Sequence, residues 1–176
     1  MIVSDADGLI KLGKSGALSE LLSATQVLVP RAVWDEAVEE GKRGMYEDAY
    51  ILERELEAGG AEIVEQQPRE EAEALLAGSA AALGAGESAA LGVFFARGAD
   101  AILTDDRAFL GLLASSEPPV PALVPVAAIV LLAEADRLSL EEAREALNKL
   151  EGSVRKSVLA AALEELDTLE KRKKGE

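Results

Sequence analysis

Carboxylates follow two apolar segments of this 176-residue chain, and they are the side chains that first suggest chemistry. Asp5 and Asp7 come after the apolar start of "MIVSDAD". A second pair, Asp105 and Asp106, follows "AILT". Aspartates directly after a buried strand are used by two different classes of enzyme. In one the aspartate attacks phosphate as a nucleophile, and in the other aspartates bind the divalent metal ions used to cut nucleic acid. Two acidic pairs at one edge of a sheet repel each other, so a positive group is expected between them.

The composition narrows these choices. The chain has no cysteine and no histidine, so thiolate chemistry, disulfides and the commonest general base are excluded. Catalysis must therefore use carboxylates, hydroxyls, lysine, arginine, backbone dipoles or a metal bound through oxygen. The net charge of −15 argues against broad electrostatic binding to nucleic acid, unless metal ions neutralise the acidic site and local basic residues hold the backbone.

Alternating strands and helices must position these acids, and they predict an α/β fold with a central parallel sheet covered by helices. The predicted strands are residues 1–7, 26–30, 61–66 and 100–104, and the predicted helices are residues 8–24, 31–41, 45–58, 68–78, 84–99 and 105–114. Beyond a loop at 115–121 the pattern is mostly helical. Ser139 before "LEEA" predicts a helix N-cap.

Ligands of a parallel α/β sheet bind beyond the carboxyl ends of its strands, where both aspartate pairs are expected. Glu36 lies on the helix after the second strand, and Glu87 lies in the first turn of the helix after "GAG". Each acid also has an ordinary explanation. Glu36 belongs to an acidic run, Glu87 favours the helix dipole, and "TDD" suits an N-cap.

The order of these acids resembles the PIN-domain nuclease family, which includes toxins of toxin–antitoxin pairs. That family has an acid after the first strand, a glutamate after a "VP"-like step, a further acid at a helix start and a "T-x-D" after the next strand. The chain supplies "IVSDAD", "LVPRAVWDEAV" and "GAGESAALGVFFARGADAILTDDRAFL" in that order. The resemblance covers residues 1–115. It implies a three-layer α/β/α core there and a helical C-terminal extension over 116–176, together one PIN-like domain over 1–176.

The resemblance also implies a metal-dependent ribonuclease. Asp5, Glu36, Glu87 and Asp106 occupy the family's acidic positions, and oxygen ligands select Mg²⁺ or Mn²⁺. The third acid is more often aspartate in the family. Asp105 competes with Asp106 as a ligand or serves as the N-cap, and we expect Asp106 to be the main ligand because it stands in the T-x-D position. Asp7 and Thr104 are expected to support the site through hydrogen bonds.

The same resemblance implies an RNA substrate, a cognate antitoxin that inserts a segment into the acidic site, and a homodimer. Candidate phosphate contacts are Lys11, Lys14, Arg31, Arg97 and Arg107. Trp34 and Tyr46 are expected to be buried or to face a partner rather than to stack on a base. No secretory signal is visible, and the longest apolar stretch is too short to span a bilayer, so a cytoplasmic protein without membrane contact is expected.

Two rival interpretations remain open. "DADG" also resembles the D-x-D-G motif of haloacid-dehalogenase-type phosphatases, but that family needs a lysine ahead of its final acids. The chain has no lysine between Lys42 and Lys149, and this interpretation leaves Glu36 and Glu87 without a role. The second rival is a catalytically inactive PIN-like module that only binds a partner.

Overall fold

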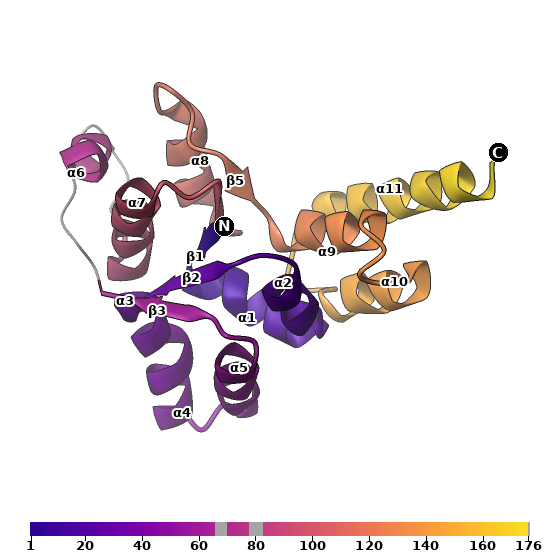
Figure 1. Cartoon of the computed structure of the whole chain (residues 1–176), viewed down its shortest axis with the longest axis horizontal. Helices are drawn as coiled ribbons and strands as arrows, with labels where there is room; N and C mark the ends of the chain where they lie inside the picture. Colours follow the sequence, from indigo (N-terminus) through magenta and orange to yellow (C-terminus); the bar gives the residue numbers. More distant parts are fainter. Residues whose placement is uncertain (66–69, 78–82, 176) are drawn as a thin grey trace.

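The computed structural model describes residues 1–65, 70–77 and 83–175 of the chain. Within these residues, five parallel strands form one sheet in the order β3-β2-β1-β4-β5 (Figure 1). The strands are β1 (Ile2–Ser4), β2 (Val27–Pro30), β3 (Glu62–Val64), β4 (Ala101–Leu103) and β5 (Ala122–Leu123). The central strand, β1, pairs with both β2 and β4. The direction of strand addition reverses between β1 and β4, which is where ligands of such sheets bind.

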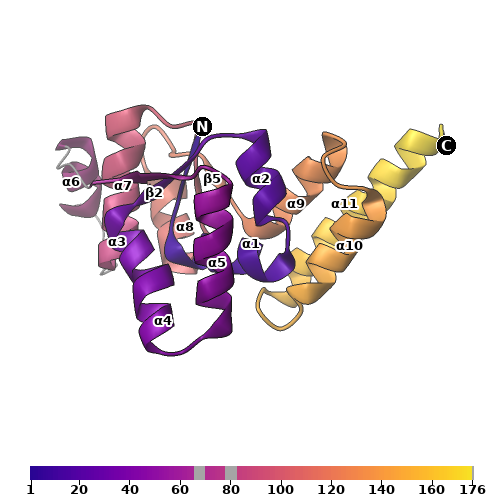
Figure 2. The same ribbon diagram turned by 60° about the horizontal axis from the view of Figure 1, so that its bottom comes forward.

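Helices connect these strands and cover both faces of the sheet (Figure 2). They are α1 (Ala6–Ser15), α2 (Leu18–Ala24), α3 (Arg31–Trp34), the π-helix η1 (Asp35–Glu40), α4 (Gly41–Arg43), α5 (Glu47–Ala58), α6 (Glu70–Ala77), α7 (Ala85–Arg97), α8 (Arg107–Ser115), α9 (Pro125–Glu134), α10 (Leu140–Lys149) and α11 (Lys156–Lys174). In the part of the chain that the structure describes, no helix is both long enough and apolar enough to cross a membrane.

Successive side chains along the strands point to opposite faces of the sheet, so the hydrophobic core has two parts, one on each face. Val3, Leu28 and Ile102 point to one face and pack with residues of α6, α7 and α8. Their neighbours in sequence, including Ile2 and Leu103, point to the other face and pack with α1, α2, α5 and α9. The predicted three-layer α/β/α arrangement around a parallel sheet is therefore confirmed.

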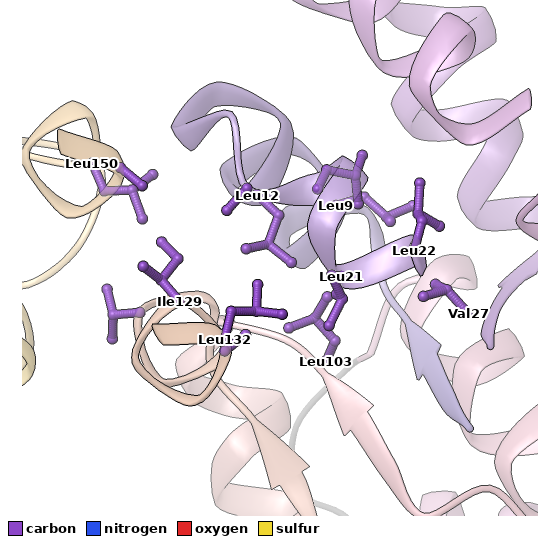
Figure 3. Packing of buried hydrophobic residues seen from close by; sticks show 14 of the residues in the cluster. Leu9, Leu12, Leu21, Leu22, Val27, Leu103, Ile129, Leu132 and Leu150 are labelled. Carbon is purple, nitrogen blue, oxygen red and sulfur yellow. The ribbon is translucent and has the colours of Figure 1, made fainter. Parts of the chain in front are cut away.

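The C-terminal helices share the second part of the core rather than standing apart. Figure 3 shows Ile129 and Leu132 of α9 beside Leu12 of α1, with Leu103 of the sheet nearby. Helix α10 begins at a capping box, in which the Ser139 hydroxyl accepts from the Glu142 N–H at 3.2 Å and the Glu142 carboxylate accepts from the Ser139 N–H. The predicted N-cap at Ser139 is confirmed.

Several predicted element boundaries were wrong. The first strand ends at Ser4, so Asp7 lies in the first turn of α1 instead of on a strand. The helix predicted over 8–24 is two helices, since α1 ends at Ser15 and is capped by Gly16, which has the left-handed φ of 79° that glycine adopts without strain. The helix after β2 contains a π-helical segment, and β5 within the region predicted as helical was missed. Part of the helix predicted over 68–78 lies outside the described residues.

Candidate active site

Acidic side chains from four parts of the chain meet at the carboxyl edge of the sheet. Asp5 and Asp7 follow β1, and Asp105 and Asp106 follow β4, so the two pairs flank the point where strand order reverses. Two glutamates reach the same region from helices. They are Glu36 on η1 and Glu87 in the first turn of α7. The order inferred from the sequence thus becomes one cluster in space.

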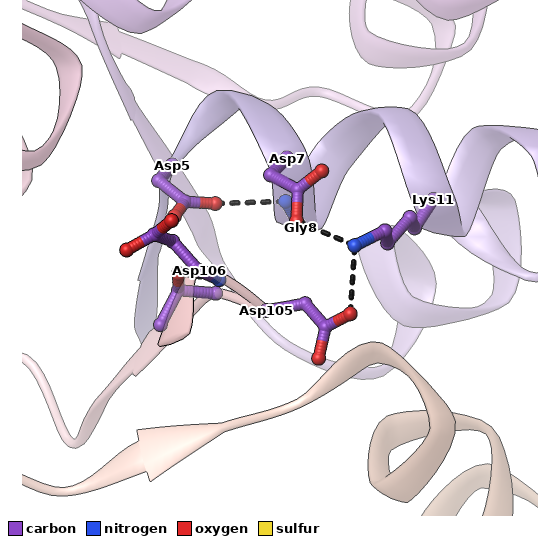
Figure 4. Close-up of polar contacts among 7 residues, drawn as sticks. Asp5, Asp7, Gly8, Lys11, Asp105 and Asp106 are labelled. Carbon is purple, nitrogen blue, oxygen red and sulfur yellow. Dashed lines mark hydrogen bonds and ion pairs between the residues drawn. The ribbon is translucent and has the colours of Figure 1, made fainter. Parts of the chain in front are cut away.

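Asp5 is the most deeply placed of these acids, and the residue is only 3% exposed. It is the N-cap of α1, and its Oδ1 accepts a hydrogen bond from the Gly8 N–H at 2.7 Å (Figure 4). Burial raises the pKa of Asp5 to about 7, the Asp7 and Glu87 carboxylates add to the rise, and hydrogen bonds from Thr104 and Gly8 oppose it. A cation close to Asp5 would therefore stabilise the ionised form of its carboxylate.

Asp106 is fixed by the helix that it begins. It is the N-cap of α8, and its Oδ1 accepts from the Phe109 N–H at 2.7 Å. The buried Thr104 hydroxyl accepts in turn from the Asp106 N–H at 3.1 Å. One carboxylate oxygen of Asp106 is therefore used in capping, and its second oxygen remains for a ligand. The N-cap role considered for Asp105 belongs to Asp106.

Asp105 instead forms an ion pair. The Lys11 ammonium lies 2.7 Å from Asp105 Oδ2 and 2.6 Å from Asp7 Oδ2, so it links helix α1 to the segment after β4 (Figure 4). Lys11 was considered only as a phosphate contact. The sequence does signal the Asp7–Lys11 ion pair, because these residues stand four apart on one helix.

Glycines allow the two glutamates to approach the start of α7. A Cβ at Gly86 would lie 2.8 Å from Glu36 Oε2, and a Cβ at Gly84 would lie 2.6 Å from Glu87 Oε2. Partial desolvation, then the Glu87, Glu40 and Asp7 carboxylates, raises the pKa of Glu36 above its ordinary value, although Glu36 remains open to solvent. The "GAG" segment thus brings Glu36 next to the N-terminus of a helix. The π-helical turn that carries Glu36 is a feature often found at functional sites.

Most of the other candidate substrate contacts lie elsewhere. Lys14 pairs with Asp48, and Arg31 pairs with Glu65. Arg97 does not lie near the acids, because it ends α7 and pairs with Glu62 at the amino edge of the sheet, opposite the cluster. Trp34 is buried, whereas Tyr46 is 65% exposed. Arg107 is exposed beside the cluster, immediately after Asp106.

The donor set fits a hard divalent cation. Every acid in the cluster offers oxygen, and a bound cation would relieve the repulsion of Glu87 with Asp5 and with Glu36. Across residues 1–65, 70–77 and 83–175, no three acidic side chains already stand in a metal-binding arrangement. Binding would therefore draw the carboxylates of Glu36 and Glu87, which end flexible side chains, toward those of Asp5 and Asp106.

The raised pKa of Asp5 predicts how stability depends on pH. Folded protein binds this proton more tightly than unfolded protein, whose Asp pKa is 3.8, so between about pH 4 and 7 the folded state holds more protons and becomes less stable as pH rises. We expect metal-free Asp5→Asn to gain stability over the wild type by about 2–3 kcal/mol between about pH 5 and 8. Urea unfolding in EDTA measures the difference, and parallel pH curves for the two proteins would refute this assignment.

Gly8 predicts a local steric effect. A Cβ at Gly8 would lie 2.7 Å from the Leu103 carbonyl oxygen and 3.1 Å from Asp5 Oδ1, and backbone atoms cannot move aside cheaply. We expect Gly8→Ala to destabilise the protein by about 1–3 kcal/mol in urea unfolding. Gly13→Ala in the same helix is the control, because its Cβ would meet Leu52 at an ordinary 3.4 Å, and it should be neutral or stabilising. Equal effects of the two substitutions would contradict the close approach of α1 to β4.

Comparison with known proteins agrees with this arrangement. No curated protein and no solved structure shows a significant match to the chain. A family model described as "PIN domain" matches residues 1–168, which is nearly the whole sequence. The protein therefore belongs to the PIN-domain family, whose members are in general nucleases and typically use divalent metal ions.

Proposed function

We propose that this PIN domain is a metal-dependent endoribonuclease that hydrolyses RNA phosphodiester bonds. The observation that carries the proposal is the meeting of Asp5, Glu36, Glu87 and Asp106 at one edge of the sheet, in a chain without histidine or cysteine. Such a set of oxygen donors suits Mg²⁺ or Mn²⁺. The PIN-domain match disfavours the phosphatase alternative, since it extends over residues 1–168.

Four acids share one role in this proposal, since Asp5, Glu36, Glu87 and Asp106 would together hold the metal. When bound, the ion supplies activation of a water molecule and stabilisation of the charge on the leaving oxygen. Gly8 and Thr104 orient Asp5 and Asp106 through the hydrogen bonds described above, so the deepest ligands are positioned before the metal arrives.

RNA would be held locally rather than by a broad basic surface. The net charge of −15 repels a polyanion at long range, so contacts must come from the metal and from nearby cations such as Arg107. Within this proposal the protein acts as the toxin of a toxin–antitoxin pair, works in the cytoplasm and forms a homodimer. The natural partner is an antitoxin that covers the acidic cluster.

One observation favours a second function, that of a PIN-like module that binds a partner without catalysis. Among the described residues the acids are not yet arranged around a metal position, and Lys11 already forms ion pairs with Asp7 and Asp105. Such a module would bind Mn²⁺ weakly or not at all.

Cleavage of an end-labelled single-stranded RNA separates the two functions. We expect the wild-type protein to cut in Mn²⁺ or Mg²⁺ and to stop cutting in EDTA. Calorimetric titration with Mn²⁺ is the parallel measurement. If purified protein neither cuts several RNAs nor binds Mn²⁺, the protein is a binding module and not a nuclease.

A further inference from the structure

Lys11 occupies a place that the proposed metal chemistry leaves unexplained. Its ammonium bridges Asp7 Oδ2 and Asp105 Oδ2 at 2.6 and 2.7 Å, which are short, charge-assisted hydrogen bonds. Both partners flank the proposed ligands, because Asp7 follows Asp5 by two residues and Asp105 directly precedes Asp106. A positive charge is thus already present inside the acidic cluster.

The burial of this bridge distinguishes it from a surface ion pair. The side chains of Lys11 and Asp105 are 13% and 11% exposed, so this pair is largely buried, whereas the side chain of Asp7 is 45% exposed. One turn further along α1, Lys14 pairs with Asp48 at 3.3 Å with both side chains more than 40% exposed. Removing one partner of a largely buried pair leaves an uncompensated charge, so the Lys11 bridge is costly to open, whereas the Lys14 pair is not.

From this geometry we propose that Lys11 is a built-in cation that keeps Asp7 and Asp105 out of the metal coordination set, so that the cluster binds a single divalent ion. This inference rests on the proposed function, since it assumes that Asp5, Glu36, Glu87 and Asp106 bind metal. In two-metal nuclease sites the ions lie about 3.5–4 Å apart. Here the Lys11 ammonium occupies Oδ2 of both Asp7 and Asp105, the two carboxylates beside the proposed ligands, and its positive charge repels a second divalent ion.

The substitution that tests this role is Lys11→Met, which removes the charge and keeps an unbranched side chain of similar length. Its effect is read from the number of Mn²⁺ ions bound per chain, measured by electron paramagnetic resonance titration of the metal-free full chain. We expect one ion in the wild type and two in Lys11→Met. Lys11→Arg retains the charge and should bind one ion, as should the matched control Lys14→Met on the same helix.

The outcomes separate this inference from the proposed function. Wild-type protein that binds no Mn²⁺ overturns both. Wild-type protein that binds two ions, or Lys11→Met that still binds one, overturns the role of Lys11 and leaves the nuclease intact.

Asp105→Asn gives an independent test if Lys11→Met does not fold, because the asparagine still offers an oxygen to Lys11. We expect it to bind one Mn²⁺ with affinity within about threefold of the wild type, since Asp105 is not a ligand. A loss of more than about 100-fold, which exceeds the effect usual for residues one shell beyond the ligands, would place Asp105 in the coordination set and overturn the proposal.

Discussion

Replacing Asp5 with asparagine is expected to lower metal-dependent RNA cleavage by more than about 100-fold, because substitution of residues one shell further from a metal already costs 10–100-fold. Asp5 is the deepest acid of the cluster and is held by the Gly8 N–H. Asparagine keeps the oxygen that caps α1 but removes the negative charge that attracts the cation. The fold should survive, and the metal-free variant should be more stable than the wild type near pH 8.

Cleavage rates and circular dichroism of the two proteins test this expectation together. Asp100→Asn is the matched control, since Asp100 precedes β4 at the opposite edge of the sheet and is exposed. The control should cut at a rate within about twofold of the wild type, as is usual for surface changes away from a site. Cleavage by Asp5→Asn at a rate close to that of the wild type would remove Asp5 from the site.

Glu36→Gln carries the second large expected effect, which is a loss of Mn²⁺ affinity of more than about tenfold together with a greater loss of cleavage. Glu36 Oε2 lies so close to α7 that a Cβ at Gly86 would be 2.8 Å away, and partial desolvation together with repulsion from nearby carboxylates raises the pKa of Glu36. Glutamine preserves the shape but neither repels these neighbours nor attracts a metal. Metal-free Glu36→Gln should therefore be at least as stable as the wild type.

Asp35→Asn is the control for Glu36→Gln, because Asp35 is the preceding residue of the same π-helix and is exposed. Calorimetric titration with Mn²⁺ compares the two variants with the wild type. Equal affinities in all three proteins would show that Glu36 lies near the metal without binding it, and the coordination set would then need a different member.

The sequence was sufficient for strands β1 to β4 and for the order of the acids, because both depend on local patterns. Buried strands followed by aspartates mark the carboxyl edge, and a parallel sheet brings such edges together. Strand β5 was missed because it is only two residues long, Ala122 and Leu123, and lies among prolines that interrupt any pattern. Its place depends on pairing with β4, which is a contact between distant residues.

The details of the site depended on tertiary contacts that no spacing reveals. The different roles of Asp105 and Asp106 follow from the first turn of α8, where Asp106 binds the Phe109 N–H and Asp105 turns toward Lys11. Likewise, the need for glycine at position 86 arises because η1 packs its Glu36 against α7. The order of these acids in the chain predicts that they lie close together. The contacts that each acid makes depend on how the helices pack on the sheet.

The chemical nature of the RNA ends after cleavage tests the central claim most directly. If carboxylates hold a metal and water is the nucleophile, wild-type protein in Mn²⁺ should produce ends with a phosphomonoester and a hydroxyl, and EDTA should stop the reaction. Attack by the RNA's own 2′-hydroxyl would instead leave a 2′,3′-cyclic phosphate. Cyclic phosphate ends, or cutting that continues in EDTA or is unchanged in Asp5→Asn, would contradict a metal-dependent nuclease built on this acidic cluster.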